Sequence, residues 1–201
     1  MFKLPEAEKK LKTKISSYRS ALRKEKKEHG SISDGSGKRY ILFSLYMILN
    51  EHEKSSEYFD WYCKEFPDDA GEPFQKLCWA ISLFRMNKES RAKIVLADAM
   101  LSNLYLLPNV FGESIKEEYD IWHSSNFTQR DYSFDLPDDI WLNIKENEKN
   151  WIKESYNSFD LRRIRKSYVN IYSQLNTSND FEERKALLKE SYSLLGSIKT
   201  S

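Results

Sequence analysis

A glycine-rich turn ahead of a helical segment holds the residues closest to a known binding chemistry. The run Gly35-Ser-Gly-Lys38 has glycine and lysine spaced as in part of a nucleotide phosphate loop. A complete loop also needs a Ser or Thr hydroxyl for Mg²⁺ and a buried strand before it. Arg39 stands where that hydroxyl belongs, the first glycine of the loop is missing, and no strand pattern precedes the run. The residues therefore predict a helix start entered through a flexible turn, where exposed amides with Lys38 and Arg39 can still hold an anionic group.

Other residue types that carry out chemistry are sparse. His123 lies in the run Trp122-His-Ser-Ser-Asn126, the one place where imidazole, hydroxyl and amide groups crowd together. A nucleophile and its base must touch in space, which sequence neighbours rarely do, so we interpret this run as a loop that caps a helix pair. Cys63 and Cys78 are fifteen residues apart, and with only three His in the chain no zinc-ligand spacing appears. Both thiols are expected to be buried small hydrophobes.

Two acidic pairs, Asp68-Asp69 and Asp138-Asp139, could point to metal or acid–base chemistry. Each lies next to a predicted helix start, where carboxylates cap backbone amides and suit the positive end of the helix dipole. We therefore favour capping for both pairs. Because the sequence holds no complete catalytic or metal-ligand set, we expect no enzyme activity, no metal and no cofactor.

The elements that must position these residues are predicted to be helices. Only three Val and four Thr occur in 201 residues, whereas strands favour both types. The glycines and prolines fall between long apolar-periodic stretches, as helix interiors require. The composition therefore predicts an all-α protein of seven to eight helices. The predicted helices cover about 5–29, 38–51, 53–66, 72–87, 89–103, 137–154, 160–175 and 180–196. A less regular connection is expected over 113–136, in which the spacing of Ile115, Tyr119 and Trp122 suggests a short helix.

The central helices form two pairs of similar length. The pairs begin at Lys38 and Glu72, which are 34 residues apart, and 34 residues is the period of tetratricopeptide repeats. The second pair also carries residues at the positions that this family uses for close helix crossing: Trp79, Ala80, Leu83, Ala92, Leu96 and Ala99. In the first pair, Tyr46 and Tyr58 occupy the small positions, so its register must differ or its packing must be wider.

Residues 38–112 also resemble a looser set of bacterial tetratricopeptide-like proteins. In that set a second helix ends in an Asn-x-Tyr-x-x-Pro-x-x-x-Gly-like segment. Asn103, Tyr105, Pro108 and Gly112 keep this segment with one extra residue before the proline. The resemblance implies a right-handed superhelical stack of antiparallel helix pairs. It implies no particular activity.

The charge distribution favours two kinds of partner. The chain has 32 Lys and Arg against 31 Asp and Glu, but residues 1–29 alone hold ten basic and four acidic residues. This basic helix is expected to be a solvated face or to dock on the more acidic remainder. The alternative is contact with nucleic acid, for which Arg162-Arg-Ile-Arg-Lys166 supplies a second basic cluster.

Length and composition fit one soluble domain spanning residues 1–201. No apolar run approaches the ~20 residues that cross a bilayer, and the first residues lack a hydrophobic signal region. We therefore expect a cytoplasmic protein with free thiols and no membrane contact.

The function expected from this architecture is a non-enzymatic protein-interaction module, because helical stacks expose a long concave groove for a peptide or helix. A nucleic-acid-associated factor is the alternative. The sequence leaves the oligomeric state open. The candidate partner-binding residues are Lys38, Arg39, Lys76, Trp79, Trp122 and His123. Replacing Lys38 and Arg39 by Ala is expected to leave thermal stability within ~0.5 kcal/mol.

Overall fold

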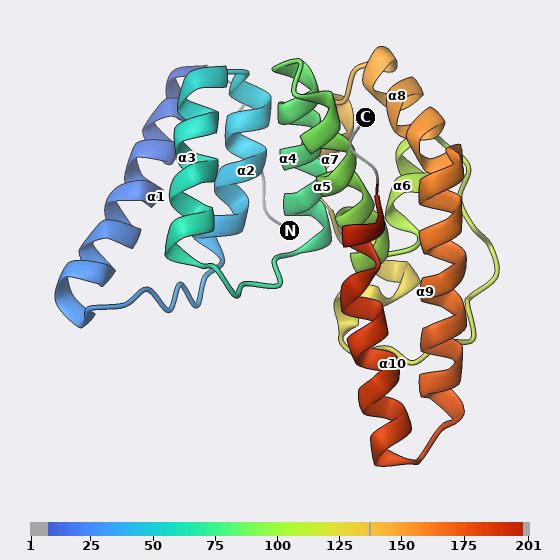
Figure 1. Cartoon of the computed structure of the whole chain (residues 1–201). Helices are drawn as coiled ribbons and strands as arrows, with labels where there is room; N and C mark the ends of the chain where they lie inside the picture. Colours follow the sequence, from blue (N-terminus) through green and yellow to red (C-terminus); the bar gives the residue numbers. More distant parts are fainter. Residues whose placement is uncertain (1–7, 137, 199–201) are drawn as a thin grey trace.

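The computed structural model describes residues 8–136 and 138–198, and every regular element in these ranges is helical (Figure 1). The all-α prediction is therefore confirmed. The α-helices are α1 (Glu8–His29), α2 (Lys38–Leu49), α3 (His52–Glu65), α4 (Pro73–Arg85), α5 (Glu89–Ser102), α6 (Leu106–Val110), α7 (Asp138–Leu142), α8 (Glu146–Asn157), α9 (Phe159–Thr177) and α10 (Phe181–Ser193). Short 3-10 turns cover Asn126–Thr128, Arg130–Asp135 and Leu195–Ser197.

The first five helices lie in nearly the same order in space as in the chain. Helix α2 packs between α1 and α4, and α4 and α5 form the closest pair (Figure 1). At the other end of the molecule, α9 and α10 pair with each other and extend below the remaining helices (Figure 1). The tip of this second pair therefore lies well away from α1.

Small residues let α4 and α5 approach closely. Ala80 on α4 and Ala92 on α5 are completely buried. The α2–α3 pair is instead filled by large rings, since Tyr46 and Tyr58 lie with their ring centroids 5.2 Å apart. Phe43 extends this aromatic layer by stacking on Phe59 with a centroid separation of 5.0 Å. That the first pair has a different register or wider packing stays a prediction.

In three places the structure differs from the prediction. The predicted helix 137–154 is divided, because α7 ends at Leu142 and α8 begins only at Glu146. The short helix that Ile115, Tyr119 and Trp122 suggested is absent, and that stretch runs as irregular chain. The unpredicted α6 begins where the Asn103 side-chain oxygen accepts hydrogen bonds from the backbone amides of residues 105 and 106. With α6 and the division included, the described residues form ten α-helices rather than seven or eight.

Two further predictions concern single elements. Residues 5–7 of the predicted first helix lie outside the described residues, and α1 ends at His29 as expected. Gly30 follows it with a φ of +75°, a left-handed conformation that glycine adopts without steric cost. Cys78 is buried as predicted, but Cys63 is exposed, because it lies at the edge of the α3 face that buries Tyr58, Phe59 and Tyr62. The prediction of two buried thiols was therefore wrong for Cys63.

No helix within residues 8–136 and 138–198 has the length and apolar character needed to cross a membrane.

Candidate functional site

A groove with a volume of about 560 Å³ lies where the middle helices meet the C-terminal helices. Its walls come from the α3–α4 connection, from α4 and α5, from residues 124–128, and from α9 and α10. Segments distant in the sequence therefore meet around one opening, and only the packing of the C-terminal helices against the α4–α5 pair creates it.

Aromatic side chains form much of the groove surface. Tyr168 and Tyr172, one turn apart on α9, stack with a centroid separation of 4.0 Å. Phe127 and Tyr192 also line the groove, and they are 42% and 79% exposed. Burial raises the pKa of Tyr168 well above its ordinary value, so this phenol stays protonated near neutral pH. The surface suits apolar and hydrogen-bonding contacts rather than proton transfer.

Lys76 lies in the groove wall, where it is already paired. Its ammonium donates to Asp98 Oδ1 at 2.8 Å and to Ser102 Oγ at 2.7 Å. The Lys76 side chain is 11% exposed and that of Asp98 is 36% exposed. Lys76 therefore contributes a fixed ion pair with α5 to the groove, and the carboxylate of Asp98 is the more accessible partner.

Trp122 and His123 are placed next to the same groove. Trp122 donates its backbone N–H to the carbonyl of Tyr172 at 2.9 Å, and its ring stacks against the Tyr172 ring. His123 Nδ1 lies 2.8 Å from Thr128 Oγ1, whose own hydrogen is donated to the carbonyl of Ser125. The imidazole must therefore donate to Thr128 rather than accept from it. This geometry does not activate the hydroxyl as a nucleophile, in agreement with a structural loop.

Arg39 is a structural residue, and the expected exposed helix amides are also occupied. The carboxylate of Asp34, which is 5% exposed, accepts from the backbone amides of Lys38 at 3.0 Å and Arg39 at 2.7 Å. The Arg39 guanidinium donates to Asp69 Oδ2 at 2.7 Å and to the Tyr40 hydroxyl at 2.6 Å. Tyr40 in turn donates to Asp69 Oδ1 at 2.7 Å, which closes a ring of three side chains. The α2 start therefore offers no free anion site.

The role predicted for Asp69 also needs correction. Asp69 anchors Arg39 and Tyr40 rather than capping the next helix, which begins with a reciprocal capping box between Glu72 and Gln75. Burial alone would raise the pKa of Asp69, but the hydrogen bonds from Tyr40 and Arg39 outweigh it and leave the pKa below its ordinary value. Asp69 therefore stays ionised as the acceptor of this network.

Lys38 and Trp79 lie away from the groove lining. The Lys38 ammonium contacts the hydroxyl of Ser36 in the preceding loop. The centroid of the Trp79 ring lies 5.4 Å from that of Phe43 and 5.5 Å from that of Phe59. The Arg91 guanidinium lies over the Trp79 ring, with its Cζ 5.6 Å from the ring centroid. Of the six predicted partner-binding residues, only Lys76 lines the groove. Trp122 and His123 lie behind it, in contact with the lining residues Tyr172 and Thr128, and Arg39 contacts Tyr40 and Asp69 of its wall.

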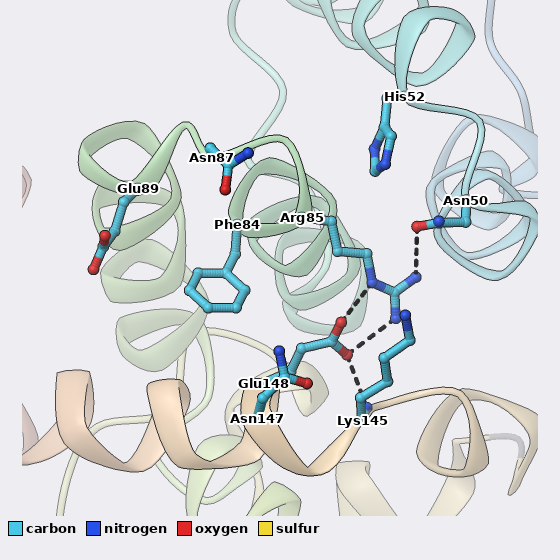
Figure 2. Close-up of a pocket in the computed structure, with 9 residues that line it drawn as sticks. All are labelled: Asn50, His52, Phe84, Arg85, Asn87, Glu89, Lys145, Asn147 and Glu148. Carbon is cyan, nitrogen blue, oxygen red and sulfur yellow. Dashed lines mark hydrogen bonds and ion pairs between the residues drawn. The ribbon is translucent and has the colours of Figure 1, made fainter.

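A second cavity, of about 430 Å³, has a more enzyme-like set of charged residues (Figure 2). Arg85 reaches from α4 toward α8 and forms a bidentate ion pair with Glu148, at 2.6 Å from Nε to Oε1 and 3.0 Å from Nη2 to Oε2. The same guanidinium donates to the backbone carbonyls of Met47 and Asn143, and Glu148 also accepts from the amide of Lys145 (Figure 2). Every part of this pair is used to hold α2, α4 and α8 together, so we assign it a structural role.

Sequence reasoning missed most residues of both cavities. Aromatic residues at helical spacing usually lie in helix cores, which holds for Tyr172 at 8% exposed but not for Tyr192 at 79% exposed. Arg85 and Glu148 are 63 residues apart and carry no local motif. The one signal in the sequence was that Tyr192 lies on a helix whose apolar face is weak. Within the described ranges, no cluster of His, Cys, Asp and Glu residues could hold a metal ion.

The chain was compared with family models, curated proteins and solved structures, and none of the three comparisons finds a match.

Proposed function

We propose that this chain is a non-enzymatic protein-interaction module whose groove takes a peptide segment of a partner protein. The observation that supports it most is the exposure of Phe127 and Tyr192 on a groove that Tyr168 and Tyr172 also line. Exposed aromatic side chains at a concave site are typical anchors of protein interfaces. The catalytic alternative has less support, because His123 and the Arg85–Glu148 pair are both occupied by internal hydrogen bonds.

We also propose that the α2–α5 region is a tetratricopeptide-like stack. The close α4–α5 crossing at Ala80 and Ala92, and the packing of α2 on α4, support this proposal. In such stacks, the first helices of successive pairs form the inner surface of the superhelix. Helix α4 contributes Pro73 and Lys76 to the groove, which agrees with this arrangement.

The chemistry of the groove favours an apolar or proline-containing peptide. The exposed rings of Phe127 and Tyr192 offer flat apolar faces, of the kind that bind extended proline-rich segments. Hydroxyl groups from Ser102, Ser124 and Thr128 lie among them, together with the Asp98 carboxylate. These oxygens can accept hydrogen bonds from the N–H groups of an extended peptide backbone.

A peptide library displayed on phage, followed by fluorescence polarisation with the selected peptides, tests this proposal. Tyr192→Ala is expected to weaken binding at least roughly tenfold, as for an interface anchor. Phe181→Ala is the matched control, because Phe181 is on the same helix, is 73% exposed and does not line the groove. Equal losses in the two variants, or the absence of any selected peptide, would contradict the proposed function.

A further inference from the structure

A small pocket with an excess of positive charge lies at the opposite end of the molecule from the α9–α10 pair. It has a volume of about 290 Å³ and is bounded by α1, α2 and the beginning of α3. Helix α1 contributes Lys12, Arg19 and Arg23, and α3 contributes Lys54. Glu51, which precedes α3, is the one carboxylate in the lining. Four cations therefore share a confined space with one anion.

The carboxylate does not neutralise the two arginines. Glu51 contacts Lys12 at 3.1 Å and Lys54 at 2.8 Å. Arg19 and Arg23 form no ion pair with a carboxylate among the described residues. They are four residues apart, so helical geometry places them on the same face of α1. The pocket therefore presents two adjacent guanidinium groups whose charge is not compensated nearby.

Two buried aromatic residues hold the Arg19 side chain in place before any ligand binds. Its Nη1 donates to the Tyr46 hydroxyl at 3.2 Å, and its Cζ lies 6.0 Å from the centre of the Tyr58 ring. Tyr46 is 1% exposed, and the bond from Arg19 is the only hydrogen bond of its hydroxyl within the described residues. Burial raises the pKa of Tyr46, so its hydroxyl keeps a proton. That proton remains available for an acceptor in the pocket that Tyr46 lines.

We propose that this pocket binds the phosphate group of a small phosphate monoester. Guanidinium groups match the oxygen geometry of phosphate, and paired arginines are the usual donors for it. Arg19 and Arg23 would contact its oxygens, and Tyr46 and Ser16 supply hydroxyl donors at the pocket wall. This site goes beyond the proposed peptide groove and does not depend on it.

The shape of the pocket favours a monoester over nucleic acid. A monoester can enter with its phosphate first, because only one phosphate oxygen carries a substituent. The phosphate of a nucleic-acid backbone carries chain on two oxygens, and both chain directions would have to pass out of the pocket. The second predicted basic cluster, residues 162–166, lies on α9 at the other end of the molecule, so it cannot extend the site (Figure 1). In that cluster, Arg165 is also occupied by Tyr156, with its Cζ 3.7 Å from the ring centre.

Isothermal titration calorimetry with phenyl phosphate tests the proposal at about pH 7.5, where a monoester carries nearly two charges. Arg23→Gln is expected to weaken binding roughly tenfold, as for loss of a hydrogen bond to a charged group. Arg23 is exposed and forms no ion pair with the residues that the structure describes, so this variant should fold like the parent, which circular dichroism can verify. Tyr46→Phe keeps the buried ring and is expected to weaken binding roughly threefold.

Lys10→Gln is the matched control, because it removes one charge from the same helix. Lys10 is nine residues from Arg19, about two and a half turns, and therefore faces the opposite side of α1. Its affinity for phenyl phosphate should equal that of the parent. Equal losses in Lys10→Gln and Arg23→Gln would overturn the proposal, as would absence of binding or equally tight binding of the diester methyl phenyl phosphate. Competition by an oligothymidylate without terminal phosphates would also overturn it, in favour of a nucleic-acid surface.

Discussion

Removing Glu148 while leaving Arg85 in place should destabilise the protein strongly. Arg85 is 9% exposed and Glu148 is 1% exposed, so the variant Glu148→Leu leaves a buried guanidinium without its counter-charge. Loss of one partner of a buried ion pair costs about 3–5 kcal/mol. For a chain of this size that corresponds to a fall in Tm of roughly 6–20 °C.

The double variant Arg85→Met/Glu148→Leu should recover much of that loss, because an apolar pair of similar volume carries no desolvation penalty. The recovery should be incomplete. Arg85 also donates to the carbonyl of Met47 at 2.5 Å and to that of Asn143 at 2.9 Å. Two acceptors lose a partner in the double variant, which leaves about 1–3 kcal/mol of destabilisation.

Urea unfolding followed by far-ultraviolet circular dichroism measures these differences, provided that the slope with denaturant stays constant. Lys153→Ala is the control on the same helix. Lys153 pairs with Glu113 at 2.5 Å, but both side chains are about half exposed, at 47% and 56%. This change should stay within ~0.5 kcal/mol. A loss of under ~1 kcal/mol in Glu148→Leu, or a double variant no more stable than that single one, would refute the reasoning.

Three other changes separate structural from surface roles. Arg39→Ala should lower the free energy of unfolding by about 1.5–3 kcal/mol, because the partly buried Asp69 carboxylate loses its charged partner and keeps only its neutral donors. Lys38→Ala should change it by less than ~0.5 kcal/mol, and equal thermal melts for the two variants would contradict the network described above. Ala80→Leu should destabilise by about 1–3 kcal/mol through overpacking of the α4–α5 crossing, and a parent-like urea midpoint would show that the crossing has room. In the folded protein Ellman's reagent should react with Cys63 alone, because burial raises the pKa of Cys78 to about 12 and shields its sulfur; two equally fast thiols would contradict the burial of Cys78.

Helix type and most helix ends were predictable because local chemistry sets them. Pro73 begins α4, and Gly30 takes the left-handed conformation just after α1. Apolar residues three or four positions apart along 160–175 indicate the buried face of α9 without knowledge of its neighbours. Each of these features depends on residues within one or two helical turns, so the sequence alone contains the necessary information.

Side chains at helix borders were harder to interpret, since their partners lie in other elements. Asp69 has the position of a helix cap in the sequence, but Arg39, 30 residues earlier, captures its carboxylate. Asp34, expected only as part of a loop, takes the capping role for α2. A short-range pattern cannot tell which of several nearby carboxylates a guanidinium will reach.

The sequence by itself determined an all-helical chain, its approximate helix boundaries and the small residues at the α4–α5 crossing. Only the tertiary structure decided that α9 and α10 pack beside that pair and turn Tyr172 and Tyr192 toward a groove. It also decided that Arg85 meets Glu148 and that Arg19 and Arg23 face Lys54. The physical reason is range: helix propensity and capping act within a few residues, whereas grooves, ion pairs and charged pockets depend on how helices far apart in the chain are packed.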